Sequence, residues 1–174
     1  MTRCNRLQIQ ENPSYDAEAM EFLRRLQDSA FSMWVLGSDS IWSYPTILTL
    51  HTVGLAILVG AAVVIDLRLL GVGAAVPLRT IRGLYRYVWL GFAINLVSGV
   101  VLFIVQAADH AVQWIFYVKL ACIAVAFVLA LRIKRRAFDG PEGAPEGSLR
   151  PMAVVSLLCW VAAITAGRLM AYVS

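Results

Sequence analysis

The sequence predicts an all-α membrane protein: a four-helix transmembrane bundle with an N-terminal amphipathic helix on the periplasmic surface. The first observation is composition, because hydrophobic residues make up 60% of the 174 residues and charged residues only 15%. The second is a mean hydropathy of +0.72. A soluble domain of this size would have too little polar surface to cover such an apolar core. The third is a set of four apolar segments, each about long enough to cross a hydrocarbon layer of roughly 30 Å.

The four predicted spans differ in the charges that they carry. The second span has no acid, lysine or arginine, and the first has none before Asp66. Lys119 interrupts the body of the third span, and Arg168 interrupts that of the fourth. The chain therefore divides into an N-terminal segment, residues 1–40, and a membrane bundle, residues 41–174. The predicted spans are residues 44–70, 87–108, 112–133 and 152–173.

The basic residues predict the orientation of these spans. The connections between the first and second spans and between the third and fourth are rich in arginine. The connection between the second and third spans, around AADHAVQ, has no lysine or arginine. The positive-inside rule then predicts a multi-pass protein of the bacterial inner membrane with both termini in the periplasm. The basic residues of the two inner connections and their edges are Arg68, Arg79, Arg82, Arg86, Arg132, Lys134, Arg135, Arg136 and Arg150.

The segment before the first span contains acids and no apolar run ahead of a cleavage-like site. It is therefore not a secretory signal, and we expect the first span to be an uncleaved anchor. Its apolar residues recur at helical spacing, which predicts an amphipathic helix lying on the outer membrane surface or packing on the bundle. Ser38, Asp39 and Ser40 can cap the following helix. The apolar residues are Met20, Leu23, Leu26, Ala30, Phe31 and Trp34.

Three ionisable residues from three spans share one depth. At about 1.5 Å of rise per residue, His51 and Lys119 lie roughly 10 Å below the outer surface and Arg168 roughly 8 Å below it. Ionisable groups inside a membrane are costly and commonly mark a functional site. Alternatively, Lys119 and Arg168 snorkel to the surface, and His51 bonds a neighbouring helix. His110 lies in the short outer connection. Gly54, on the same face as His51, either admits a close helix or leaves room for a flat cofactor.

Asp66 and Arg68 lie at the inner end of the first span. They are two residues apart, so they do not face each other on a helix and each needs its own partner. Arg82 or Arg86 is the expected partner of Asp66. We interpret this pair as a feature that fixes the orientation of the bundle.

Two functional classes find no support in the sequence. There is no basic tail or nucleic-acid motif, so nucleic acid is not an expected partner. Cys4, Cys122 and Cys159 are odd in number and far apart, without the spacing of a metal site or a disulfide framework. We interpret Cys122 and Cys159 as small buried apolar residues.

Several motifs carry a resemblance to known families. The chain contains SxWxYPTxLTLHTVGLAxxxGxxxxxDLRLLG, then FYVKL in the third span and AGRLMAY in the fourth. With these it resembles a family of small four-span bacterial inner-membrane proteins without an assigned biochemical function. It is more distantly similar to the four-helix, heme-binding protoporphyrinogen oxidases and to copper-resistance membrane proteins of the D type. The oxidase resemblance implies a first-span histidine near heme b and a functional third-span lysine, which match His51 and Lys119.

The leading hypothesis is a membrane protein that binds heme b and has a redox or electron-transfer role. His51 Nε2 would ligate the iron, because neutral imidazole binds iron well. Lys119 and Arg168 would pair with the propionates. His110, Met170 or Lys119 is the candidate for the second axial position, which otherwise stays open. A bis-histidine diheme cytochrome is excluded because it needs four membrane histidines.

Two alternatives remain open at this stage. The first is a non-catalytic accessory or scaffold subunit, in which the polar layer joins helices and the N-terminal helix docks another membrane subunit. The second is copper handling by His51, His110 and either Met33 or Met170, since thioether and imidazole ligands suit copper. Expected partners are the lipid bilayer, other membrane subunits and a periplasmic redox protein.

Overall fold

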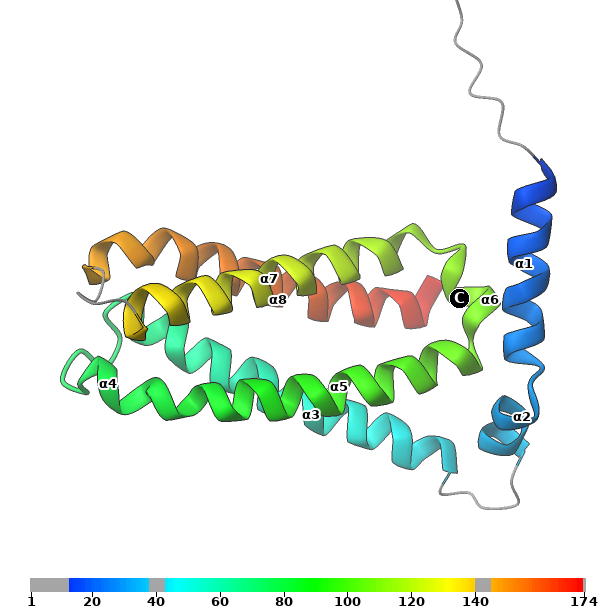
Figure 1. Ribbon diagram of the computed structural model, residues 1–174, viewed down its shortest axis with the longest axis horizontal. Helices are drawn as coiled ribbons and strands as arrows, with labels where there is room; N and C mark the ends of the chain where they lie inside the picture. Colours follow the sequence, from blue (N-terminus) through cyan, green and yellow to red (C-terminus); the bar gives the residue numbers. More distant parts are fainter. Residues whose placement is uncertain (1–12, 38–42, 140–144, 174) are drawn as a thin grey trace, which may run out of the picture.

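The computed structural model describes residues 13–37, 43–139 and 145–173, which form helices and no strand. Four helices are long and apolar enough to cross a membrane, so the predicted four-helix membrane bundle is confirmed. The shorter helices lie at the two ends of this bundle (Figure 1). The long helices are α3 (Ser43–Leu69), α5 (Tyr85–Val105), α7 (Trp114–Phe138) and α8 (Glu146–Val173). The shorter elements are α1 (Pro13–Gln27), α2 (Ala30–Gly37), α4 (Leu78–Ile81), η1 (Arg82–Leu84) and α6 (Ala107–Ala111).

The bundle consists of two helical hairpins, α3 with α5 and α7 with α8, and α3 also packs on α8. Aromatic side chains join α5 to α7. The rings of Phe92 and Phe127 stack with centroids 4.2 Å apart, and Trp89 meets Phe127 edge-on at 5.3 Å. Lipid tails are as apolar as these side chains, so such close packing, and not exclusion from water, holds membrane helices together.

Two glycines explain why α3 and α5 lie so close. A Cβ added at Gly91 would lie 2.5 Å from the backbone nitrogen of Leu58. One added at Gly54 would lie 2.7 Å from Cγ2 of Ile94. Both positions are buried. Small residues at such crossings let the two backbones approach.

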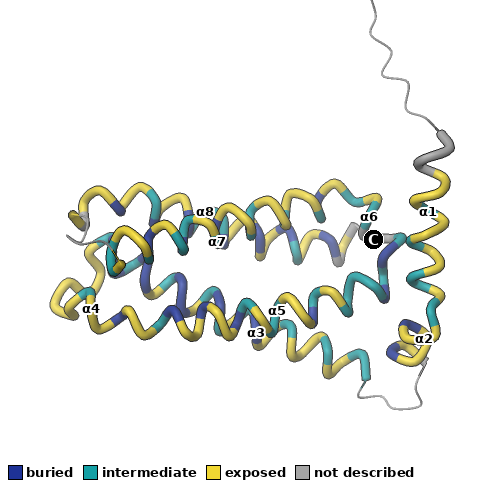
Figure 2. The backbone as a smooth tube through the Cα atoms, viewed as in Figure 1, coloured by how far each residue is buried: buried dark blue, intermediate teal, exposed yellow. Residues whose placement is uncertain are grey.

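Exposed apolar side chains cover the outside of the bundle. Figure 2 shows buried residues where helices meet and exposed residues on the outward faces. Val97, Leu158 and Val161 each expose more than 60% of their surface. Apolar surface all around four long helices is what a lipid environment requires. The protein is therefore a multi-pass membrane protein whose outer surface contacts the bilayer.

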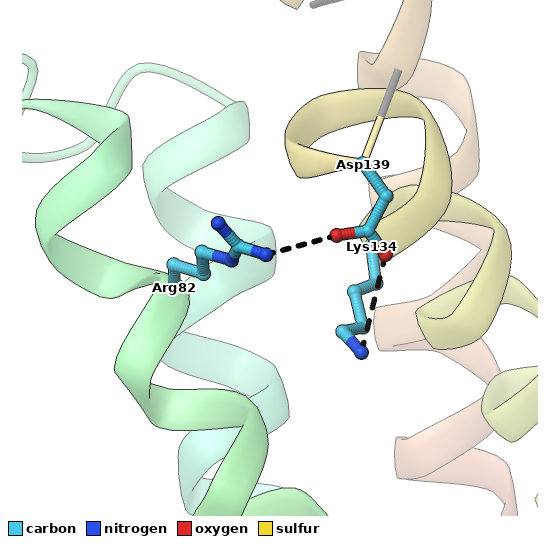
Figure 3. Close-up of polar contacts among 3 residues, drawn as sticks. All are labelled: Arg82, Lys134 and Asp139. Atoms are coloured by element: carbon cyan, nitrogen blue, oxygen red, sulfur yellow. Dashed lines mark hydrogen bonds and ion pairs between the residues drawn. The ribbon is translucent and has the colours of Figure 1, made fainter.

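An ion-pair network ties the hairpins together at the end that holds α4. Arg82 of η1 donates a 3.2 Å hydrogen bond to Asp139, the residue after α7 (Figure 3). Lys134 Nζ lies 3.9 Å from the other carboxylate oxygen. Arg86 instead donates to the hydroxyl of Tyr87. The expected pairing of Asp66 with Arg82 or Arg86 is therefore wrong.

The short helices α1, α2 and α6 lie at the opposite end, with α1 running across the bundle axis (Figure 1). The backbone N–H of Ala108 donates a 3.0 Å hydrogen bond to Oε1 of Gln27, which fixes the end of α1 to α6. Ser43 Oγ donates to the carbonyl oxygen of Val35, which fixes α2 to the start of α3. A helix across the bundle end agrees with the predicted surface helix.

Several boundaries differ from the sequence prediction. The N-terminal segment forms two helices, because Ser29 caps a new one by accepting a hydrogen bond from the backbone N–H of Ser32. The second span ends at Val105, and α6 follows as a separate helix. The third and fourth helices extend beyond the predicted spans into the connection between them, so that α7 ends at Phe138 and α8 begins at Glu146. Helical hydrogen bonding does not stop where the apolar residues end. The proposed cap at residues 38–40 lies outside the described residues.

Candidate functional site

His51 is held by α5 through both its ring and its backbone. Nδ1 of the imidazole lies 2.9 Å from Oγ of Ser98. Nδ2 of Asn95 donates a 2.9 Å hydrogen bond to the backbone carbonyl oxygen of His51. Asn95 and Ser98 are three residues apart, so they lie on one face of α5. Two polar residues of one helix thus fix the position of the only histidine within the predicted spans.

The contacts of the Ser98 hydroxyl allow the tautomer of His51 to be assigned. The hydroxyl donates a 2.6 Å hydrogen bond to the carbonyl oxygen of Ile94, one turn earlier on α5. A hydroxyl has a single hydrogen to donate, so we assign it as the acceptor of a hydrogen bond from the histidine. In this assigned tautomer Nδ1 bears the ring proton, and Nε2 keeps its lone pair. No described residue forms a hydrogen bond with Nε2. This is the arrangement in which a neutral imidazole serves as a metal ligand.

A glycine keeps space at the edge of this ring. A Cβ added at Gly99 would lie 3.2 Å from Cε1 of His51 and 3.7 Å from Nδ1. A larger residue would therefore press on the ring beside its Ser98 contact. Gly99 thus preserves the orientation that Ser98 sets.

Lys119 comes from the other hairpin. It is half-buried on α7, and its Nζ would lie 3.6 Å from a Cβ added at Gly167 of α8. It is also close enough to His51 for the two groups to interact electrostatically. No described residue forms an ion pair with Lys119. The structure therefore brings together His51 and Lys119, two of the three residues predicted to share a depth.

Arg168, the third of these residues, is exposed on α8. It follows Gly167, but neighbouring residues of a helix point in directions about 100° apart. No described residue forms an ion pair with its guanidinium. Its exposure suits the snorkelling alternative, and its role at a cofactor stays a prediction.

The remaining predicted residues occupy different places. Ile94 fills the space beside Gly54, which favours the interpretation that Gly54 admits a close helix. His110 belongs to α6, and its side chain lies outside what the structure describes. Met33 is exposed on α2. Met170 is buried near the end of α8, in a cluster against which Phe116 of α7 packs.

No group of three or more His, Cys, Asp or Glu residues that could hold a metal ion occurs among the described residues. One hollow of the described surface lies on α1 and another on the outward face of α3. His51 lines neither of them. What the arrangement offers chemically is thus a single imidazole nitrogen without a described hydrogen-bond partner, near the amine of one lysine.

The DLRLLG motif forms the end of α3 and the turn toward α4. Nε of Arg68 donates a 2.7 Å hydrogen bond to the carbonyl oxygen of Val76, and the guanidinium also bonds that of Ala74. Arg68 therefore holds the connection to α4. Gly71 ends the helix with a φ of 102°. Backbone bonds from Gly71 to Arg68 and from Val72 to Leu67 complete a Schellman cap.

Sequence reasoning missed the partners of His51. With the second span predicted to end at residue 108, Ser98 lies roughly 15 Å and Asn95 roughly 20 Å below the outer surface, which is one to two helical turns deeper than His51. Their spacing of three, which puts two polar side chains on one face of the span, was the available signal. It does not reveal that this face points to the histidine.

The model of a family of unknown function, DUF6644, matches residues 38–173. No curated protein and no solved structure matches the chain.

Proposed function

The chain belongs to the DUF6644 family of unknown function. We propose that the protein binds heme b in the outer half of its bundle and has a redox or electron-transfer role. The observation that carries the proposal is the hydrogen bond between Ser98 and His51, which leaves the lone pair of Nε2 available. Heme b supplies one-electron chemistry at its iron when an imidazole nitrogen ligates it.

The residues near His51 suit this ligand in two respects. The Nδ1 hydrogen bond orients the ring and favours one tautomer, as the hydrogen-bond partners of metal-bound histidines do. The Lys119 cation, which has no described carboxylate partner, would bind a propionate through a charge-assisted hydrogen bond. Arg168 would serve a second propionate at the outer surface. His110, Met170 and Lys119 remain the candidates for a second axial ligand.

The first experiment is an absorption spectrum of the heme-supplied, detergent-purified protein before and after dithionite. We expect a Soret band that moves on reduction. His51→Ala should lose this band while the bundle stays folded. Thr52→Ala is the matched control, because Thr52 is exposed and its hydroxyl bonds only its own helix at Leu48. A folded wild-type protein with a flat spectrum would contradict the proposal.

Two further variants test the geometry. Ser98→Ala should keep heme but shift the spectrum or the reduction potential, because Nδ1 loses its partner. Lys119→Met should weaken heme retention, whereas Lys134→Met, which changes the only other lysine, should not. Identical retention in both lysine variants would remove Lys119 from the site.

A second candidate function is a non-catalytic accessory subunit. The observation that favours it is the exposed apolar surface of α2, where Met33 and Trp34 each expose more than 60% of their surface at the end of the bundle. A protein that purifies colourless, metal-free and only alongside other membrane subunits would support this candidate. The structure gives less support to copper handling. Of its two candidate thioether ligands, Met33 is exposed on α2 and Met170 is buried between α7 and α8. Metal analysis of the purified protein tests it directly.

A further inference from the structure

A second polar site lies in the inner half of the bundle, away from His51. Asp66 of α3 exposes 2% of its surface, and its Oδ2 has no hydrogen-bond partner among the described residues. Asp66 adjoins the largest apolar cluster of the bundle, which contains Ile65, Leu69 and Trp160. An ionisable group in such surroundings on a membrane helix calls for a functional explanation.

The groups around Asp66 leave hydrogen-bonding capacity unused. The Ser156 hydroxyl of α8 lies beside the carboxyl. Ser156 exposes 1% of its surface, and its Oγ has no hydrogen-bond partner among the described residues. Trp160 lies one turn further along α8 on the same face, and its Nε1 also has no partner among the described residues. Three buried polar side chains are thus incompletely satisfied on two packed helices.

The basic side chains near Asp66 have interaction partners other than Asp66. Arg82 and Lys134 bind Asp139 at the surface (Figure 3). Arg68 bonds the connection to α4. Tyr85 of α5 is the titratable group close enough to feel the Asp66 charge, and it is itself buried. The salt bridges among the described residues leave Asp66 without a basic partner.

We propose that Asp66 is a proton-binding carboxyl site between α3 and α8, with Ser156 as its hydrogen-bond partner. A buried carboxylate without a cation is costly, whereas a protonated carboxyl carries no charge and offers both a donor and an acceptor. The Ser156 oxygen can accept from the carboxyl O–H. The site lies near the inner end of the bundle, from which a proton would enter and leave. It depends on none of the residues proposed to bind heme.

The test is infrared spectroscopy of the full chain in a detergent without ester groups. We expect the carbonyl band of a protonated carboxyl at neutral pH, shifted in D₂O and by ¹³C-labelled aspartate. Asp66→Asn should abolish this band. Asp139→Asn, which changes an acid at the same end of the bundle, should leave it unchanged. A folded wild-type protein without the band, or a band that survives in Asp66→Asn, would overturn the proposal.

Two other variants keep the proposal falsifiable if Asp66→Asn does not fold. Ser156→Ala should move the band, because the carboxyl loses its partner, and a folded variant with an unmoved band contradicts the assignment. Stability gives an independent readout. Asn is a neutral mimic of a protonated Asp, so Asp66→Asn should melt near wild type and Asp66→Ala clearly lower. Equal losses in both variants would indicate that the charge itself is required.

Discussion

At the scale of single residues, each polar group of the DLRLLG motif has its own role. Asp66 faces α8 from inside the bundle, and Arg68 bonds the backbone of the connection to α4. Gly71 supplies the left-handed conformation that ends α3. Asp66 and Arg68 therefore have separate partners, as their spacing of two residues predicts, although the neighbour of Asp66 is Ser156 and not an arginine. What makes these groups tolerable in an apolar span is burial against protein at its inner end.

We predict that Gly71→Ala destabilises the protein by about 1–2 kcal/mol, because an L side chain is disfavoured in the left-handed region. Gly83→Ala is the matched control. Neither position has an atom within 4 Å of an added Cβ, but only Gly71 has positive φ. The measurement is the free energy of unfolding of both variants in detergent. A loss of similar size at Gly83 would contradict the conformational explanation.

At the scale of elements, the α3–α5 contact holds the candidate site. Gly54 and Gly91 let the two backbones approach, and this approach brings Ser98 and Asn95 to His51. Glycine inside a helix weakens the isolated helix relative to alanine. Its presence at these crossings therefore reflects packing between helices.

We predict that Gly91→Ala destabilises the bundle by about 1–3 kcal/mol, the usual cost of overpacking. The added Cβ would lie 2.5 Å from the Leu58 backbone, so a helix must move. Gly60→Ala should be neutral or stabilising, since an added Cβ there meets nothing within 4 Å. Thermal melting of both variants in one detergent makes the comparison. Equal melting temperatures would show that α3 and α5 adjust without cost.

At the scale of the whole molecule, the two ends of the bundle differ in kind. One end has α4, the ion pairs of Asp139 and the arginine-rich connections. The other has α1, α2, α6 and the end of α8 (Figure 1). A bundle with this asymmetry has a defined way to sit across a membrane, and the basic end is expected to face the cytoplasm.

We predict that the basic end of the bundle faces the cytoplasm, and thiol labelling tests this orientation. The starting point is a variant without Cys4, Cys122 and Cys159. Val112→Cys places an exposed thiol between α6 and α7, and Val72→Cys places one in the connection after α3. A membrane-impermeant reagent should label position 112 in intact cells and position 72 only after permeabilisation. The opposite pattern would reverse the topology.

The membrane class and the four spans follow from the amino-acid sequence alone, as does the expectation that His51 and Lys119 share a depth. Length and hydropathy count residues across a lipid layer, and a helix rises by a constant amount per residue, so number and depth follow from the chain alone. Depth does not reveal which way a side chain points. In these spans the lipid-facing and core-facing sides are both apolar, so no amphipathic pattern marks the inner face.

The neighbours of each polar group, in contrast, become visible only in the tertiary structure. It paired His51 with Ser98 and brought Lys119 near the histidine, while Arg168 is exposed. It also directed Asp66 toward Ser156 and not toward an arginine. These outcomes depend on the rotation of each helix about its axis. Contacts between helices set that rotation; for example, Gly54 and Gly91 allow α3 and α5 to pack closely. Such contacts involve two helices, so the residues of one span do not reveal them.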